Sequence, residues 1–206
     1  MGRNGAAKAA WRARLRAQRR ERLAEPGFVP DAACRLAAAP GLGTVLPGAA
    51  EWVAAFASTP LEPPTEALLA RLAAAELRVL LPVFDPDLLG PAAASAWGEV
   101  TAVTCALPAG RPGRPALPPE PWLDASGLGR CSLVLVPALA VDRAGTRLGQ
   151  GGGWYDRALR FAAPDALLLG VCFPWEVVAA GELPRDTHDV PLHGVLTMAG
   201  VELFAK

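Results

Sequence analysis

The order of apolar and helix-forming segments predicts an α/β fold, a three-layer domain with a mostly parallel sheet flanked by helices. The first observation is an apolar segment at 51–58, followed by a helical run at 65–76 and a second strand at 78–81. The second is the return of buried-strand patterns at 133–136 and 165–173. A strand, helix, strand order favours parallel pairing with a right-handed crossover. A chain of 206 residues with 52% hydrophobic residues is long enough to bury a core of this kind.

The other elements are predicted within the same single domain, which covers residues 1–206. Residues 6–24 contain strong helix formers and neither Gly nor Pro, which predicts a basic N-terminal helix. Val, Thr and Trp at 97–107 favour a strand near a sheet edge. Residues 108–130 are rich in Pro and Gly and indicate a long loop, either a substrate-covering flap or a disordered segment. Shorter elements are predicted as a helix at 31–38, a helix at 174–180 and a strand at 194–198.

Charge is balanced over the whole chain, with 20 basic and 20 acidic residues, but it is unevenly distributed. The first 22 residues hold eight basic groups and one acid. A nucleic-acid-binding helix is one hypothesis for such a segment, and the acidic remainder of the chain argues against it. Most of the arginines in this helix are expected to form a solvated face, namely Arg14, Arg16, Arg19, Arg20 and Arg22.

Cysteine and apolar patterns exclude several classes of protein. The four cysteines lack C-x-x-C spacing, so they predict buried thiols in a reducing compartment rather than a zinc site or redox pair. His188 and His193 are five residues apart and make a poor metal pair. No apolar stretch reaches the roughly 18 residues of a membrane span, and a signal-peptide apolar region is missing. These features predict a cytoplasmic protein without a membrane partner.

A glycine cluster follows the strand at 133–136 and reads RLGQGGGWYDR over residues 147–157. Four glycines in five positions let the backbone reach positive φ and bring bare N–H groups close to a ligand. A helix beginning at Trp154 would add its positive end. Arg147 supplies fixed positive charge, and Asp156 is an oxygen ligand of the kind that Mg²⁺ takes beside phosphates. The spacing matches neither a Walker loop nor GxGxxG, so a flexible surface loop is the alternative to the phosphate-binding turn that we favour.

The run RLGQGGGWYDR, with VPALAVD before it, resembles the signature of the 5-formyltetrahydrofolate cyclo-ligases. Further segments resemble the family's landmarks in the same order along the chain: Lys8-x-x-x-Arg12, Glu62-Pro-Pro-Thr65, Glu120-Pro121 and His188-Asp189-Val190-Pro191. Three positions depart from the family's pattern. Ala138 stands for Gly and Val141 for Phe, which suggests altered packing. Trp154 replaces the first of two tyrosines, so it keeps a flat face but loses a hydroxyl.

The resemblance implies ATP-dependent cyclisation of 5-formyltetrahydrofolate to 5,10-methenyltetrahydrofolate, with release of ADP and phosphate, through a phosphorylated formyl group. It implies Mg²⁺ as the cofactor and ATP as a co-substrate. By the same resemblance, Arg147 and Lys8 are catalytic, Asp156 and Asp189 hold the metal, and Glu62, Trp154 and Tyr155 bind the folate. The residues that the resemblance assigns to ATP are Lys8, Arg12, Arg147, Leu148, Gly149, Gln150, Gly151, Gly152, Gly153, Trp154 and Tyr155.

Several alternatives stay open at this stage. Glu62 follows a predicted strand, where ligands of α/β sheets bind, but a carboxylate at a helix start is explained equally well as a favourable end charge. Trp154 allows a nucleotide- or folate-binding relative without turnover. The expected partners are small molecules, ATP and a reduced folate, and the oligomeric state is open with a monomer favoured.

Overall fold

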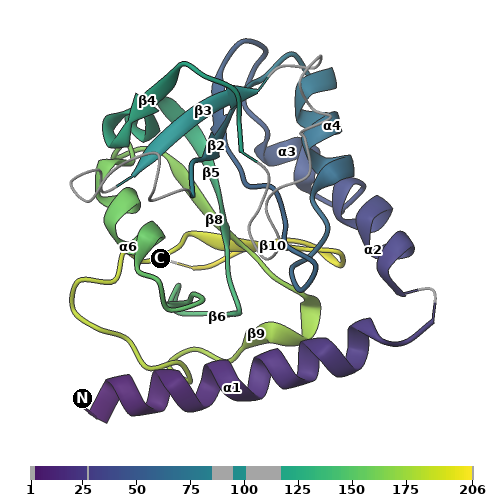
Figure 1. Cartoon of the computed structure of the whole chain (residues 1–206), viewed down its shortest axis with the longest axis vertical. Coiled ribbons are helices and arrows are strands. Elements are labelled where there is room, and N and C mark those ends of the chain that lie inside the picture. The colour runs from purple at the N-terminus through teal and green to yellow at the C-terminus, as the bar shows by residue number, and fades with distance from the viewer. Residues whose placement is uncertain (1–2, 27, 85–94, 101–116, 206) are drawn as a thin grey trace.

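An eight-stranded sheet lies at the centre of the computed structural model, which describes residues 3–26, 28–84, 95–100 and 117–205 (Figure 1). Its strands are, in spatial order, β11 (Gly200–Leu203), β10 (Gly194–Thr197), β8 (Leu167–Val171), β5 (Cys131–Pro137), β1 (Trp52–Ala54), β2 (Arg78–Pro82), β3 (Ala96–Val100) and β4 (Trp122–Asp124). All pairings from β10 to β2 are parallel, whereas β11, β3 and β4 pair antiparallel at the edges. The prediction of an α/β fold with a mostly parallel sheet is confirmed.

Helical segments cover both faces of this sheet because the side chains of each strand alternate between two apolar cores. On β5, Leu133 and Leu135 point into the first core, while Val134 and Val136 point into the second. The helices that contribute to the first core are α2 (Phe28–Ala37), α3 (Leu42–Val45) and α4 (Glu66–Ala74). The second core is covered by the 3-10 turns η1 (Ala125–Arg130) and η2 (Leu159–Phe161) and by α6 (Trp154–Ala158).

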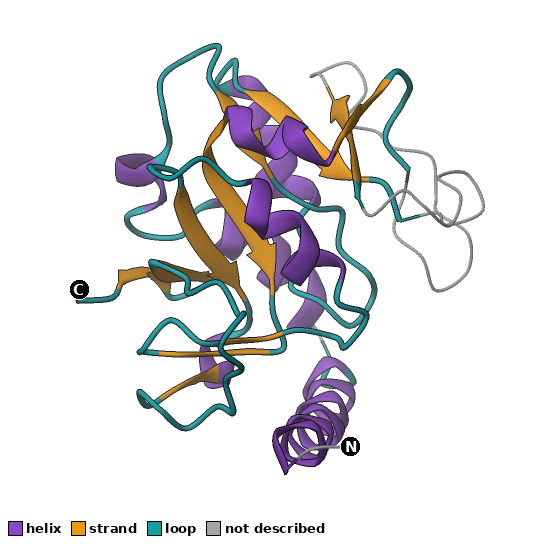
Figure 2. Cartoon of the chain, turned by 90° about the vertical axis from the view of Figure 1, so that its left-hand side faces the viewer, coloured by secondary structure: helices purple, strands orange, loops and turns teal. Residues whose placement is uncertain are grey.

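A second, smaller sheet separates the main sheet from the long N-terminal helix α1 (Arg3–Leu23) (Figure 1). Its strand order is β7 (Arg147–Leu148), β6 (Ala140–Asp142) and β9 (Val177–Val178). Leu15 of α1 is buried against Leu139, Leu148 and Leu183, and Trp11 packs on the same cluster. Figure 2 views α1 nearly end-on and shows it at the margin of the molecule.

A buried aspartate organises the hairpin that leads into the glycine cluster. Asp142 is 0% exposed, and its Oδ1 accepts hydrogen bonds from the backbone N–H groups of Ala144 and Thr146 at 3.0 and 2.9 Å. Its Oδ2 accepts one from Gly181 at 3.1 Å. Gly145, at the tip of this hairpin, has φ +82°, and a Cβ there would meet the Leu192 carbonyl oxygen at 2.4 Å. The side chain of Asp142 and the bare backbone of Gly145 therefore set the direction in which the chain enters β7.

Two predicted elements differ from the structure. The predicted helix at 174–180 is a 3-10 turn, η3 (Pro174–Glu176), followed by the strand β9. Val177 and Val178 are β-branched and favour extended backbone, and they pair in parallel with β6. The predicted loop at 108–130 contains β4 and η1 in its described part. Residues 108–116, and 101–107 of the predicted strand at 97–107, lie outside the described residues.

The cysteines agree only in part with the expectation of buried thiols. Cys131 and Cys172 are buried, whereas Cys34 is exposed on α2. Cys105 lies outside the described residues. Within the described part of the chain, no helix combines the length and the apolar character that crossing a membrane requires.

Candidate functional site

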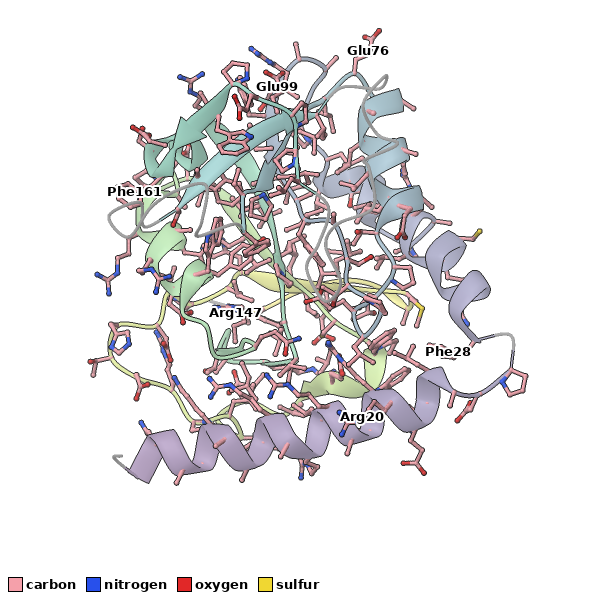
Figure 3. All side chains as sticks on the ribbon, viewed as in Figure 1. Arg20, Phe28, Glu76, Glu99, Arg147 and Phe161 are labelled. Carbon is pink, nitrogen blue, oxygen red and sulfur yellow. The ribbon has the colours of Figure 1, made fainter. Side chains whose placement is uncertain are left out.

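A cavity of about 220 Å³ opens between α1, the glycine cluster and the carboxyl ends of the central strands. Every site residue named from the sequence lines it: Lys8, Arg12, Glu62, Arg147, Leu148, Gly149, Gln150, Gly151, Gly152, Gly153, Trp154, Tyr155, Asp156 and Asp189. Phe84 and Pro137 complete the lining. Arg147 is labelled in Figure 3, between α1 and α6. Residues from both ends of the chain thus meet at the strand ends, where parallel sheets bind ligands.

The glycine cluster forms an open backbone turn. Gly151 and Gly153 have φ of +104° and +68°, values that a residue with a Cβ rarely adopts. A Cβ on Gly149 would lie 2.5 Å from Nη1 of Arg147, whereas one on Gly152 would meet nothing within 4 Å. α6 begins at Trp154 without a side-chain cap, which leaves its first N–H groups available. It is only five residues long before it tightens into η2, so its dipole adds less than the sequence suggested.

Arg147 lies beneath this turn and is held by two partners. Its Nη1 donates to the carbonyl oxygen of Pro137 at 3.3 Å, and its Nη2 pairs with Oδ1 of Asp156. The side chain of Arg147 is 8% exposed, whereas that of Asp156 is 43% exposed. The guanidinium therefore lies at the cavity wall with both terminal nitrogens engaged, and bidentate contact with an anion requires release of these partners.

α1 presents further cations to the same cavity. Nε of Arg12 donates to the carbonyl oxygen of Gly149 at 2.9 Å. One turn further along, Nη2 of Arg16 donates to the carbonyl oxygen of Gln150 at 2.6 Å. Arg16 was expected on a solvated face, and that expectation is corrected in part, because the residue is half-buried and bonded to the glycine turn, although this hydrogen bond is exposed and Arg16 does not line the cavity. The spacing of four residues from Arg12 is the signal that could have identified it.

Two carboxylates from the C-terminal part of the chain hold Lys8 at the cavity. Its Nζ lies 2.7 Å from Oδ2 of Asp186 and 2.8 Å from Oδ2 of Asp189. Burial lowers the pKa of Lys8, but the hydrogen bonds and charges of the two aspartates outweigh it and raise the pKa above its ordinary value. Burial raises the pKa of Asp189, and the hydrogen bonds from Lys8 and from the Asp186 N–H outweigh it, so that the pKa is lowered. This cluster is therefore charged on both sides at neutral pH.

The two carboxylates assigned to a metal each balance a cation in this structure. Asp156 pairs with Arg147 and Asp189 with Lys8, and among the described residues Oδ2 of Asp156 and Oδ1 of Asp189 make no hydrogen bond. Asp189 also belongs to a group with Asp186 and His188 whose ligand atoms lie within 4.8 Å of one another, and Asp156 does not. Free carboxylate oxygens beside a phosphate-binding turn suit Mg²⁺, which needs only one or two protein ligands when phosphates supply the rest.

Another wall of the cavity is aromatic and is lined by Phe84, Trp154 and Tyr155, whereas Trp97 packs against it without lining the cavity. The ring centroid of Trp154 lies 4.9 Å from that of Phe84, 5.0 Å from that of Trp97 and 4.8 Å from that of Tyr155. Tyr155 is buried, and burial together with the negative charge of Glu62 raises its pKa well above the ordinary value, against the opposing charge of Arg147. In the described residues, neither Nε1 of Trp154 nor the Tyr155 hydroxyl has a hydrogen-bond partner. This wall offers flat apolar faces to the cavity, while the two unpaired donors are buried in it.

Glu62 stands beside the aromatic wall and has one oxygen committed. Its Oε2 accepts hydrogen bonds from the backbone N–H and the hydroxyl of Thr59, both at 2.9 Å. These bonds fix the loop between β1 and α4, so the carboxylate faces the cavity in a defined position. Phe84 was missed in the sequence, although its place just after β2 is the signal that the strand-end rule provides.

Arg19 contradicts the sequence-based expectation most strongly. It was placed on a solvated face, but it is 0% exposed and pairs with Glu176 at 2.6 Å. Arg14, Arg20 and Arg22 are exposed, which confirms the expectation for these three residues. Two of them also contact aromatic rings, since Arg14 stacks on Trp11 at 3.8 Å and Arg22 on Trp175 at 4.6 Å. α1 therefore directs much of its charge at its own protein, which weakens the hypothesis of a nucleic-acid-binding helix.

These features define an α/β protein whose pocket combines a cationic, glycine-lined side with an aromatic side. Comparison with known proteins agrees with this description of the fold and the pocket. A model of the 5-formyltetrahydrofolate cyclo-ligase family matches residues 4–198. The 5-formyltetrahydrofolate cyclo-ligase of Mycolicibacterium smegmatis is 42% identical over 145 residues, which cover 70% of this chain and 72% of that protein. The chain belongs to the 5-formyltetrahydrofolate cyclo-ligase family.

Solved structures support the fold. The 5,10-methenyltetrahydrofolate synthetase of Aquifex aeolicus matches with a TM-score of 0.64 at 21% identity, over 97% of this chain and 93% of that one. The 5,10-methenyltetrahydrofolate synthetase of Mycoplasma pneumoniae matches with a TM-score of 0.65 at 16% identity, over 92% of this chain and 97% of that one.

Ala138 and Val141, which depart from the family's sequence pattern, are both buried. Val141 fills the space above Gly170, where an added Cβ on Gly170 would lie 2.6 Å from Cγ2 of Val141.

Proposed function

We propose that this protein converts 5-formyltetrahydrofolate to 5,10-methenyltetrahydrofolate with hydrolysis of ATP to ADP and phosphate. Membership of the cyclo-ligase family supports the proposal. The observation that carries it is the meeting of an anion-binding side and an aromatic side in one cavity. A reaction between a polyphosphate and a flat heterocycle needs both sides, with the reacting atoms at their boundary.

The proposed chemistry overcomes the poor leaving ability of a formamide oxygen. The formyl oxygen attacks the γ-phosphorus of ATP, and the bond from this phosphorus to the ADP oxygen breaks. The product is an iminium phosphate. N10 of the folate then forms a bond to the formyl carbon, loses its proton to solvent, and the carbon–oxygen bond breaks to release phosphate. Phosphoryl transfer of this kind depends mainly on positioning and charge neutralisation.

The protein's own residues are suited to those two tasks. Lys8, Arg12 and Arg147 surround the glycine turn with positive charge, and the bare N–H groups from Gly149 to Gly153 supply further donors. Arg147 and Lys8 are the proposed catalytic residues because they would face the charge that grows on the transferred phosphoryl group. Trp154 and Tyr155 would stack on the pterin, and Glu62 would accept hydrogen bonds from the N–H groups of the pterin.

Mg²⁺ is the proposed cofactor, and it would neutralise phosphate charge during transfer. Asp156 and Asp189 would hold it through the oxygens that they keep free of hydrogen bonds with the described residues. Their present partners, Arg147 and Lys8, would then turn toward the phosphates. The two carboxylates would thus hold the Arg147 and Lys8 side chains at the cavity before ATP binds, and the phosphates of ATP would then replace them as partners.

The test follows both products and the path of one atom. Purified protein is mixed with MgATP and 5-formyltetrahydrofolate labelled with ¹⁸O in the formyl group, and methenyl absorbance and ADP are measured together. We expect equal amounts of the two products and one ¹⁸O atom in each phosphate released. Omission of ATP should abolish the absorbance change. Unlabelled phosphate would refute the phosphorylated formyl intermediate, and absence of the methenyl product would refute the activity.

A second candidate function is ligand binding without turnover. The observation in its favour is Trp154, whose buried Nε1 lacks a partner among the described residues where the family pattern has a tyrosine. Under this alternative, calorimetry would detect ATP or folate binding while the mixture above forms no ADP. Formation of the two products in equal amounts would exclude it.

A further inference from the structure

The guanidinium of Arg19 joins α1 to three distant segments. Its Nε and Nη2 donate to the two carboxylate oxygens of Glu176 at 2.6 and 2.8 Å. Nη2 also donates to the carbonyl oxygen of Ala138 at 2.6 Å, and Nη1 donates to that of Leu61 at 3.1 Å. These partners are 157, 119 and 42 residues away along the chain. All three donor atoms of the fork are therefore occupied in a site that is 0% exposed.

The segments that Arg19 joins are those that border the cavity. Leu61 immediately precedes Glu62, and Ala138 immediately follows Pro137, and both neighbours line the cavity. The carbonyl oxygen of Pro137 also accepts the hydrogen bond from Arg147. Arg19 does not line the cavity itself. Any influence on the ligand therefore passes through the backbone positions that it fixes.

Arg19 also shares a face of α1 with the cations of the cavity. At 100° per residue, Lys8, Arg12 and Arg19 lie within about 40° of one another around the helix axis. Among the described side chains of α1, Leu15 is the buried apolar one, and Trp11 and Leu23 are partly buried. So few apolar contacts determine the position of the helix along its axis only weakly, because apolar contact is not directional. The hydrogen bonds of Lys8, Arg12 and Arg16 are directional but exposed or part-buried, whereas those of Arg19 to Glu176 and Ala138 are buried and fix that position most firmly.

Stability alone is a poor explanation for this arrangement. Burial raises the pKa of Glu176, and the hydrogen bonds and charge of Arg19 act against that rise. Burying two charges carries a desolvation cost, and an apolar pair of similar volume is often as stable or more stable. What an apolar pair cannot provide is a fixed register among α1 and three loops.

We propose that Arg19 is a positioning residue, which sets where α1 and the loops before Glu62 and after Pro137 stand around the cavity. The proposal rests on the proposed function for the identity of the ligands. It predicts that removal of the Arg19 hydrogen bonds disturbs ligand use in a protein that is still folded. The cationic groups of Lys8 and Arg12 would then lie at altered distances from the phosphates.

The main test replaces both members of the ion pair. The double variant Arg19→Met/Glu176→Leu leaves no unpaired buried charge, so it should fold. Its Tm should be lower than that of the wild type, because the Phe173 N–H and the Ala138 carbonyl oxygen lose their partners. We expect kcat/KM for ATP to fall by about tenfold to a hundredfold, since a misplacement of about 1 Å can cost a hundredfold. Arg20→Ala, at the exposed next position of α1 (labelled in Figure 3), is the matched control and should leave kcat/KM unchanged. A folded double variant with wild-type kcat/KM would overturn the proposal.

A second variant covers failure of the double variant to fold. Arg19→Lys keeps a charge opposite Glu176, but one ammonium group cannot reproduce the planar fork that reaches three segments. We expect a similar loss in kcat/KM for ATP, with native circular dichroism. Wild-type kinetics in Arg19→Lys would also overturn the proposal.

A readout without catalysis separates this inference from the proposed function. Hydrogen exchange of the backbone amides of residues 8–16 and of Thr59, Leu61 and Glu62 should be faster in Arg19→Lys than in the wild type, and unchanged in Arg20→Ala. If the wild type forms no methenyl product, the proposed function fails while the exchange result still decides the role of Arg19. Unchanged exchange in those two segments would refute the positioning role.

Discussion

Gly149→Ala tests the close contact between the glycine turn and Arg147. A Cβ at this position would lie 2.5 Å from Nη1 of Arg147 and 3.3 Å from its Cζ. Ordinary contact begins near 3.4 Å, so the guanidinium must move by about 0.9 Å. The clash involves the end of a flexible side chain and φ is not positive, so the fold should tolerate it. Replacing Gly by Ala at a compatible position even stabilises by about 0.4–1 kcal/mol.

Activity should respond quite differently from stability. A displacement of about 1 Å in a catalytic group can cost a hundredfold in rate, and loss of one transition-state donor about a hundredfold to a thousandfold. We therefore expect kcat for methenyl formation to fall by about a hundredfold in Gly149→Ala, with an unchanged or slightly raised Tm. Steady-state kinetics and thermal melts on the same preparation measure the two quantities.

Gly152→Ala is the comparison that isolates the cause. Its Cβ would meet nothing within 4 Å, so it adds a methyl group to the turn without moving Arg147. We expect a smaller loss of kcat than for Gly149→Ala. Equal losses in the two variants would show that displacement of Arg147 is not the reason, and wild-type kcat in Gly149→Ala would refute the role of Arg147 itself.

Four further predictions concern single side chains. Trp154→Ala should weaken folate binding and remove most of the fluorescence change on titration while Trp154→Phe retains binding, because the flat face stacks on the ligand; equal affinity of Trp154→Ala and the wild type would contradict this. Asp156→Asn should keep a near-wild-type Tm, because its ion pair is partly exposed, but should raise the Mg²⁺ concentration needed for half-maximal rate; an unchanged Mg²⁺ dependence would return Asp156 to a structural role. Burial raises the pKa of Cys131 to about 12, so alkylation at pH 8 followed by peptide mapping should modify Cys34 and spare Cys131. The pKa of Cys131 is higher in the folded protein than in the unfolded chain, where it is about 8.5. The contribution of this thiol to folding stability is therefore complete below a pH of about 8.5 and is lost as pH rises toward 12. Denaturant titrations across that range would detect the loss.

Local patterns explain what the sequence could predict. The glycine turn depends on residues that are adjacent in the chain, so its open backbone was predictable from composition. Lys8 and Arg12 were assigned through the family resemblance, and their helical spacing alone would have left them on a solvated face. The strand, helix, strand order similarly predicted the parallel pairing of β1 with β2, because a right-handed crossover favours it. The order of the strands in the whole sheet was not predictable from the sequence.

Long-range pairing explains what the sequence could not predict. Nothing near Arg19 distinguishes it from Arg20, because its burial depends on Glu176, which is 157 residues away. The same pairing affects the segment after β8. Helix propensity was overridden there, because Glu176 turns inward to Arg19 and Val177 pairs with β6. Tertiary contacts of this kind are invisible to any window of neighbouring residues.

The contact between Lys8 and its aspartates has a consequence for synthesis of the chain. Asp186 and Asp189 follow Lys8 by 178 and 181 residues. At about 5–20 residues per second on the ribosome, roughly 10–35 seconds pass before these partners exist. During that time the strands β1, β2, β5 and β8 are already made and Glu176 is present to pair with Arg19 of α1, whereas Lys8 of the same helix still lacks its carboxylates. A chain that stops before Asp186 would therefore hold most of the parallel strands and all cavity-lining residues except Asp189, but its Lys8 would lack both carboxylate partners, so this side chain is the last of the cavity's cations to be fixed in place.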